Sequence, residues 1–380
     1  MEVLEVSNKE RSENLSSVLG GLQEPIATSF YDIPLWLYSL LMEYISYAMI
    51  AVSVFGMTSN ILIIVIYIKI GFSESINISY CALGLSDALQ VTFITWNAIC
   101  FLPSFTRLNL PFIPGEVVVP TGGASTDIFC QTTAWITAWI SVERCLCVVY
   151  PFKVKAFVTR RRTLLAIITI SFFIIVPLVS LNMVLYVVEF TFDISRNRTI
   201  LRLFRRNTTI INRVNDSYFI YKALFLNLLP LLVVLVCAVY LASQLKLSAI
   251  WRLGHSGITG NGTPLDKDNK TAKRKYNKDM RIAKTVLLIA ITYIFLGTLS
   301  VQRLMVAMIW SDFRPLSTYG KWYRFTSRLA FLLLQANSSV NFVIYYKMGT
   351  KFRQTADQLL CPKKFKKFEQ TSRVSPIKPE

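Results

Sequence analysis

The sequence predicts an all-α protein, a seven-transmembrane helix bundle with its amino terminus outside the cell and a short amphipathic cytoplasmic helix after the seventh span. The 380 residues are 53% hydrophobic and only 17% charged, whereas the apolar share of soluble domains is roughly 45–50%. The apolar residues gather in seven blocks, each of about 20 residues or more, which is the length that a helix needs to cross a hydrocarbon layer ~30 Å thick. Lysine and arginine concentrate between alternate blocks, as they do on the cytoplasmic side of membrane proteins.

The apolar blocks define one compact membrane domain at 44–346. It is flanked by an extracellular, glycosylated tail at 1–43, an amphipathic membrane-surface helix at 347–361 and a flexible, basic cytoplasmic tail at 362–380. The expected spans are about 44–68, 76–101, 124–149, 164–188, 219–245, 282–310 and 325–346. Between the fifth and sixth spans, 246–281 combines glycines with many lysines and is expected to be a mobile linker.

Basic residues set the expected orientation. Of the 41 lysines and arginines, 25 fall in the loops on one side and in the carboxy-terminal tail. That side is therefore expected to be cytoplasmic, in a multi-pass protein of the plasma membrane. The arginine-rich segment 187–217 lies on the opposite side and reduces the excess of basic residues on the expected cytoplasmic side. Four Asn-x-Ser/Thr triplets on the expected outside are candidate glycosylation sites, namely Asn14, Asn197, Asn207 and Asn215.

The residue inventory argues against several function classes. The net charge of +19 would suggest nucleic acid in a soluble protein, but here it marks a membrane side, and no nucleic-acid partner is expected. The one histidine, His255, lies in the 246–281 linker, so the chain has no histidine cluster for a metal and no Ser–His pair. No enzymatic activity is expected. Only Cys100 of the seven cysteines approaches the outer face, so no intrachain disulfide is expected.

Polar residues inside apolar spans are costly in lipid and therefore point to function. They are Asn60, Asp87, Glu143, Arg144, Asn337 and Asn341. Several lie in ordered motifs: Leu83-Gly84-Leu85-Ser86-Asp87 in the second span, Glu143-Arg144-Cys145 at the end of the third with Pro151 beyond it, and Asn337-Ser338-Ser339-Val340-Asn341-Phe342-Val343-Ile344-Tyr345 in the seventh.

These motifs, in this order, resemble those of the rhodopsin-like (class A) G-protein-coupled receptors over 50–361. Residues 143–145 are a variant of that family's DRY triplet, and 337–345 are a variant of NSxxNPxxY. The chain also departs from the pattern. Val119 stands where the family has the cysteine of its loop disulfide, the sixth span has no CWxP, and Phe342 replaces the proline of NPxxY.

The resemblance implies a polar site in the middle of the bundle. Asp87 would lie with Thr133 and the seventh-span polar residues, near Asn60. The seventh-span members are Asn337, Ser338 and Asn341. In the family this pocket holds a sodium ion, which would offset the cost of a buried carboxylate. A water-filled hydrogen-bond network without sodium is the alternative.

The resemblance also implies a coupling site for a heterotrimeric G protein at the inner ends of the helices. Its expected residues are Glu143, Arg144, Pro151, Tyr345 and Asp279. Asp279 falls where the family places an acidic partner for the arginine, and a solvated loop aspartate is an equal alternative. After the seventh span, apolar residues recur every three or four positions, as in a helix on the membrane surface. Cys361 at its end is a candidate palmitoylation site, with an unmodified cysteine as the alternative.

The expected ligand pocket lies in the outer half of the bundle and consists of Asp127, Gln302, Arg303 and Arg328. No lysine lies between Phe325 and Tyr346, so a retinal Schiff base is excluded and no cofactor is expected beyond the sodium ion. Amine receptors carry their aspartate one residue before Asp127, a difference that rotates the side chain by ~100°. An amine ligand is therefore not favoured.

The outer arginines allow two interpretations. Arg303, Arg324 and Arg328 would give the entrance a positive field that attracts anionic groups. Alternatively, they would reach lipid headgroups or pair with aspartates, for which Asp127, Asp193 and Asp216 are the candidates.

Three functions remain open, and the ligand is unknown. The departures from the family pattern resemble divergent invertebrate receptors, molluscan-type chemosensory receptors in particular. The alternative within the family is a neuropeptide receptor for short amidated peptides. A seven-helix channel or transporter is a third hypothesis, which the Glu143-Arg144 motif and the amphipathic tail helix disfavour.

Overall fold

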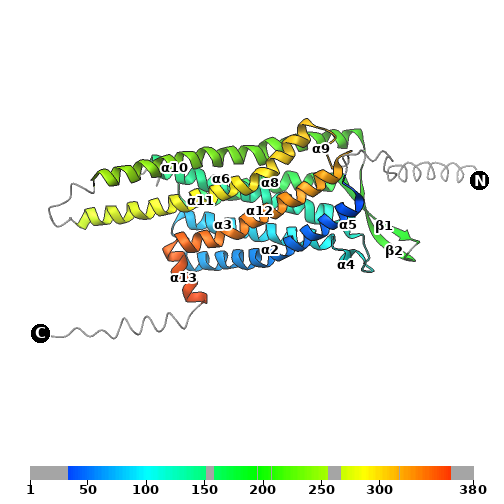
Figure 1. Ribbon diagram of the computed structural model, residues 1–380, viewed down its shortest axis with the longest axis horizontal. Coiled ribbons are helices and arrows are strands. Elements are labelled where there is room, and N and C mark those ends of the chain that lie inside the picture. Colours follow the sequence, from blue (N-terminus) through cyan, green and yellow to red (C-terminus); the bar gives the residue numbers. More distant parts are fainter. Residues whose placement is uncertain are drawn as a thin grey trace, which may run out of the picture.

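The computed structural model describes residues 33–150, 158–194, 196–206, 208–255, 267–315 and 317–360, except for the side chains of 248–255 and 267–279. These residues form a bundle of long helices that run side by side (Figure 1). The helices are α2 (Leu35–Ile70), α3 (Ser75–Cys100), α6 (Ala124–Val149), α8 (Arg160–Leu185), the continuous run α9 (Thr209–Tyr221), η2 (Lys222–Leu228) and α10 (Leu229–His255), then α11 (Lys267–Ile309) and α12 (Gly320–Met348). The predicted seven-helix fold is confirmed.

Most helix bounds differ from the predicted spans. The α3 and α6 helices lie within one residue of the prediction, but α2 begins at Leu35 and not near 44. The α10 and α11 helices extend into 246–281, so the prediction of a mobile linker there is wrong for 246–255 and 267–281. Lysine-rich sequence forms helix readily, and hydropathy alone does not mark where a helix leaves the membrane.

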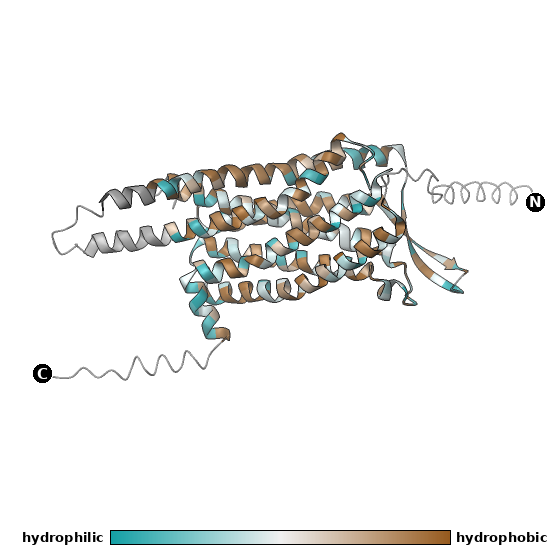
Figure 2. Ribbon diagram, viewed as in Figure 1, coloured by the Kyte–Doolittle hydropathy of each residue, from teal (hydrophilic) through white to brown (hydrophobic). Residues whose placement is uncertain are grey.

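Six of the described helices are long and apolar enough to cross a membrane by composition alone, and α6 is the exception. Figure 2 shows the apolar residues distributed along the length of the bundle. The α6 helix contacts α3, α8, α10 and α11, and its Gln131, Thr133 and Thr137 are buried. A helix surrounded by other helices exposes few side chains to lipid, so α6 can carry the polar residues that the others cannot.

The outward faces of the peripheral helices are apolar. Phe173 of α8 is 63% exposed and Phe295 of α11 is 80% exposed. Soluble monomers rarely expose contiguous apolar surface on this scale, whereas lipid tails solvate it without cost. The chain is therefore a multi-pass membrane protein.

A β-hairpin caps one end of the bundle, which we call the hairpin end (Figure 1). Strands β1 (Tyr186–Asp193) and β2 (Arg198–Arg205) pair antiparallel, and Asn197 in the turn has a φ of 49°. Residues 186–188 thus belong to β1, and the predicted fourth span ran three residues too far. The hairpin rests on the segment that contains the short helices α4 (Pro103–Thr106) and α5 (Pro114–Val118), which leads through η1 (Val119–Gly123) into α6.

The helix α13 (Thr350–Leu360) lies at the opposite end of the bundle, which we call the α13 end (Figure 1). The chain turns at Gly349, and α13 buries Phe352 and Ala356 against the bundle. Phe352 belongs to the largest core cluster together with Ile63, Ile66 and Tyr345. This packing fixes α13 to the carboxy-terminal parts of α2 and α12.

Candidate functional site

Polar side chains collect at three levels between the two ends of the bundle. In the middle, three predicted residues of α6 and α12 donate hydrogen bonds to one carboxylate, Asp87 of α3. We call these four residues, together with Asn60 of α2 and Asn337 of α12, the Asp87 cluster. Thr133 donates to Asp87 Oδ1 at 2.9 Å, Ser338 donates to Oδ1 at 3.0 Å, and Asn341 Nδ2 donates to Oδ2 at 2.8 Å. Asn60 Nδ2 donates to the backbone oxygens of Gly56 at 2.9 Å and Ser338 at 3.4 Å.

The Asp87 cluster contains buried oxygens that accept no hydrogen bond. Asp87 is fully buried and has no basic partner in the described part of the chain. The side-chain oxygens of Asn60, Asn337 and Asn341 are buried without a hydrogen-bond partner. Carboxylate and amide oxygens are the ligands that hard cations prefer, so the residues present fit a bound sodium ion and equally fit bound water.

At the α13 end, Arg144 is held by its neighbour on α6. Its Nη2 donates to Glu143 Oε1 at 2.9 Å. Glu143 also accepts hydrogen bonds from Ser75 at 2.5 Å and Ser79 at 3.2 Å, both on α3. Arg144 and Glu143 are both buried, while Arg144 Nε has no partner. We call these four residues the Arg144 cluster.

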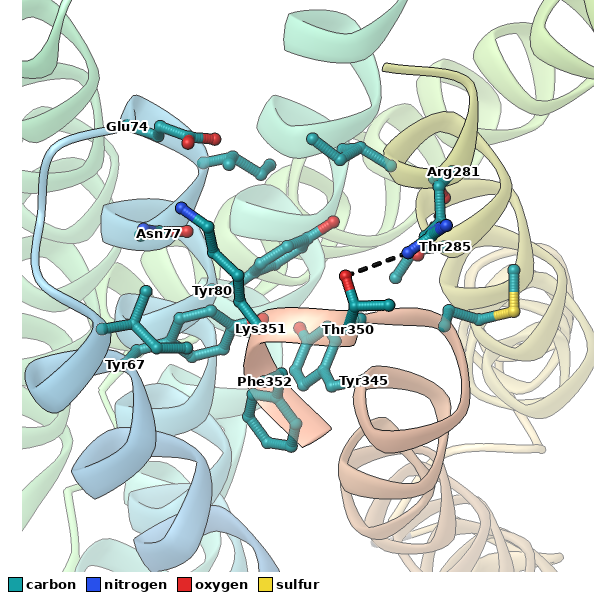
Figure 3. A pocket seen from close by; sticks show the side chains of 15 residues that line it. Tyr67, Glu74, Asn77, Tyr80, Arg281, Thr285, Tyr345, Thr350, Lys351 and Phe352 are labelled. Carbon is teal, nitrogen blue, oxygen red and sulfur yellow. Dashed lines mark hydrogen bonds between the residues drawn. The ribbon is translucent and has the colours of Figure 1, made fainter. Parts of the chain in front are cut away.

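A cavity of about 440 Å³ at the α13 end, which we call the inner cavity, opens beside the Arg144 cluster. Figure 3 shows Tyr80 and Tyr345 on its walls, and Arg281 of α11 joined to Thr350 of α13. Arg281 Nη1 donates to Thr350 Oγ1 at 2.9 Å. The Tyr80 and Tyr345 rings lie 4.7 Å apart, and both hydroxyls are buried without a partner. Among the described side chains, this end of α11 therefore touches the rest of the cavity wall through the Arg281–Thr350 contact and apolar packing.

At the hairpin end, a cavity of about 990 Å³, which we call the outer cavity, lies among α3, α6, α8, η2, α11 and α12. Asp127, Arg303 and Arg328 line it, as predicted. Asp127 pairs with Lys222 of η2, so its charge is already compensated. Gln302 does not line this cavity but is exposed on another face of α11, and the prediction for it is wrong. Adjacent helix positions point about 100° apart, which here places Gln302 on a different face of α11 from Arg303.

Arg328 and Arg303 are almost completely buried, with 4% and 5% of their surfaces exposed. Arg328 donates to Asn97 Oδ1 at 2.9 Å and to Ser46 Oγ at 3.2 Å, and its guanidinium lies 3.9 Å from the centre of the Phe101 ring. The guanidinium of Arg303 lies 4.7 Å from the centre of the Tyr323 ring, and its Nε has no partner.

The remaining predicted residues are scattered or not described. Asn197 is exposed at the hairpin turn, whereas Asn215 is half-buried in α9 and lines the outer cavity. Four other predicted residues, Asn14, Pro151, Asn207 and Cys361, lie outside the described residues, as does the side chain of Asp279. None of the six cysteines within the description forms a disulfide, and this includes the buried Cys100 and Cys130.

Sequence reasoning missed Lys222, Asn97 and the two serines that hold Glu143. Lys222 carried a usable signal, because it is an ionisable residue inside the predicted fifth span and such residues seek a partner. Asn97, Ser75 and Ser79 carried none, because single small polar residues are common near helix ends.

Residues 59–345, about three quarters of the chain, match the family described as "7 transmembrane receptor (rhodopsin family)". The matched region contains the Asp87 cluster, the Arg144 cluster and the outer cavity residues Asp127, Arg303 and Arg328. No curated protein matches the chain.

Proposed function

Because the chain belongs to the rhodopsin family of seven-transmembrane receptors, we propose that it binds an extracellular ligand in the outer cavity and activates a heterotrimeric G protein at its α13 end. The observation that carries this proposal is the order of the three levels along the bundle. A cavity large enough for a ligand lies at one end, a buried arginine held by a single acid lies near the other, and the Asp87 cluster lies between them. No catalytic role is proposed.

Two of the helices that line the outer cavity, α11 and α12, also line the inner one. Arg303 and Arg281 both lie on α11, and Arg328 and Tyr345 both lie on α12. A ligand that draws the outer ends of these helices together would change the packing at their inner ends, because close-packed helices move as rigid bodies. Breaking the Arg281–Thr350 contact would free α11 to move outward and expose Arg144 to a partner.

The test is ligand-dependent nucleotide exchange on G proteins. Membranes that contain the full-length receptor and one purified G-protein class at a time are exposed to panels of amino acids, amines, organic acids and peptides. At least one panel should accelerate exchange, and Arg144→Ala should abolish the response while surface expression persists. If the ligands produce an ion flux across the same membranes and no nucleotide exchange, a channel or transporter is favoured instead.

We propose a chemosensory role, with a neuropeptide receptor as the alternative. The outer cavity supports a small ligand, because its volume of about 990 Å³ lies at the upper end of the range for small-molecule sites, ~300–1,000 Å³. A short peptide would need part of its length outside the cavity, against the hairpin. Retinal is not proposed, because α12 has no lysine between Phe325 and Tyr346, and Gln335 of α12 instead donates hydrogen bonds to Ser53 Oγ and the backbone oxygen of Met49 in α2.

We also propose that sodium binds the Asp87 cluster and favours the inactive state. Replacing sodium chloride by N-methylglucamine chloride at constant ionic strength should raise basal nucleotide exchange of the native receptor. The Asp87→Asn variant should not respond to the exchange of salts, because it removes the charged ligand. The same sodium response in both proteins would leave a water network as the occupant of the cluster.

A further inference from the structure

Charge pairing in the outer cavity is uneven. The three acids that line it each have a basic partner: Glu116 lies 2.7 Å from Arg202, Asp216 lies 3.6 Å from Arg314, and Asp127 pairs with Lys222. Within the described part of the chain, Arg303 and Arg328 have no acidic partner. Both line the same cavity.

Their surroundings do not compensate these charges. A buried ion that is not paired costs several kcal/mol, and arginine cannot escape by losing its proton. Arg328 has only neutral hydrogen-bond acceptors, on Asn97 and Ser46. Arg303 has an aromatic ring beside it and a buried Nε without a partner. The helices hold these side chains in place, so a matching anion would be bound with little loss of side-chain entropy.

We propose that the ligand of the outer cavity is an organic anion whose carboxylate binds Arg303 of α11 and Arg328 of α12. This inference rests on the proposed function, which makes the cavity the ligand site. The guanidinium group matches a carboxylate in geometry and binds it through two parallel hydrogen bonds. Val118, Leu178 and Phe331 add apolar surface to the cavity, so the body of the ligand is apolar.

The proposal separates ligand classes. A small organic acid and a peptide with a free carboxy terminus share the carboxylate, and both fit. An amine is disfavoured, because Asp127 is neutralised by Lys222 and the two free arginines repel cations. An amidated peptide without acidic side chains lacks the group that would compensate Arg303 and Arg328.

Binding is tested on the purified, full-length receptor by thermal stability. The probes are octanoate, benzoate, glutamate and short apolar peptides with a free carboxy terminus, each compared with its own amide. At least one acid should raise the melting temperature more than its amide does, and whether acids or peptides do so identifies the source of the carboxylate. Arg303→Gln and Arg328→Gln should each weaken binding about tenfold or more, as expected for loss of a charge-assisted hydrogen bond. Arg213→Gln, an exposed residue of α9 outside the cavity, should leave binding unchanged.

Lysine variants protect the test against misfolding. Arg303→Lys and Arg328→Lys keep the charge but not the planar fork, so each should bind the acid more weakly than the native receptor and more tightly than the matching glutamine variant. Equal shifts with acids and amides, no shift with any acid, or unchanged binding in the arginine variants would overturn the proposal. Acids that bind without stimulating nucleotide exchange would overturn the proposed signalling function and leave the anion site standing. If a neutral ligand stimulates nucleotide exchange and no acid binds, the anion site is overturned and the proposed signalling function stands.

Discussion

Glu143 controls how Arg144 presents its charge. Its carboxylate accepts hydrogen bonds from Arg144 on α6 and from Ser75 and Ser79 on α3. Glu143 therefore links the arginine of α6 to α3. Arg144 has no other ion-pair partner within the described residues. Releasing this pair would free the guanidinium for the G protein that we propose to bind at the α13 end.

Glu143→Gln should therefore raise ligand-independent signalling. Glutamine can still accept from the serines, but it no longer pairs with the charge of Arg144. A net loss of about 1 kcal/mol from the inactive state would shift the equilibrium about fivefold. Basal nucleotide exchange at matched surface expression measures the effect, and Glu189→Gln, an exposed acid of β1, is the control. Unchanged basal exchange would show that the pair does not restrain the receptor.

Asp279→Asn extends this prediction to the acid expected on α11. If Asp279 also restrains Arg144, its removal raises basal exchange, and the double variant exceeds both single ones. If it is a solvated aspartate, the variant behaves like the native receptor. An exposed pair is worth only ~0–1 kcal/mol, so the smaller effect is expected at Asp279.

Among the elements, the hairpin is held without a disulfide. The backbone N–H of Leu201 donates to the oxygen of Pro111 at 2.8 Å. Glu116 of α5 pairs with Arg202 at 2.7 Å and accepts from the backbone N–H of Leu203 at 3.0 Å. Glu116 thus fixes β2 near the start of η1, where Val119 stands in place of the family's cysteine. We call these contacts of Glu116 with β2 the Glu116 clamp; they hold the hairpin by polar interactions instead of a disulfide.

Glu116→Gln should loosen the hairpin without unfolding the bundle. The variant loses the charge of the clamp, in a partly exposed pair worth about 1 kcal/mol. Amide hydrogen exchange in 198–205 should become several-fold faster, while exchange in α6 stays as in the native receptor. Glu189→Gln, the same change at an exposed acid of β1, is the matched control. Equal protection of 198–205 in both variants would refute the clamp.

Close approach of α2 and α3 depends on Gly84. A Cβ atom added there would lie 2.8 Å from Cγ2 of Ile63, which is fully buried and stiff at χ1. Gly84→Ala should lower the melting temperature through overpacking, which typically costs ~1–3 kcal/mol. Gly297→Ala is the matched control, because its nearest neighbour, Tyr293, lies at 3.4 Å and alanine favours helix. A Gly84→Ala receptor as stable as Gly297→Ala would contradict this account.

Several elements could be predicted from sequence because one physical signal marked them. Lipid requires long apolar blocks, so all seven helices were located, and the cost of buried polar groups picked out Asp87 and its neighbours. The hairpin was missed because Tyr186 to Phe190 continue the apolar block of the fourth span, where hydropathy cannot separate strand from helix. The pairing of Asp127 with Lys222 and the isolation of Arg303 depend on side-chain geometry between distant helices, which no local pattern encodes.

At the scale of the whole molecule, charge and architecture point to one orientation. The α13 end carries Arg144, Arg281 and Lys351, and the hairpin end carries the Asn197 triplet. Basic residues are retained on the cytoplasmic side during insertion, so we propose that the α13 end is cytoplasmic and the hairpin extracellular. The arginines of the hairpin do not reverse the argument, because Arg196 and Arg202 are paired with acids.

This orientation predicts where tags and glycans are found. In unpermeabilised cells, an antibody should detect an epitope tag before residue 1 and should miss one after residue 380 until the membrane is opened. Among the described triplets, Asn197 should carry a glycan, because it is exposed at a turn, and Asn215 should carry none, because it lies in a helix that lines the outer cavity. Asn197→Gln should then increase electrophoretic mobility, and Asn215→Gln should not. Both tags on one side of the membrane would exclude an odd number of spans, and with it the path by which a ligand in the outer cavity reaches Arg144.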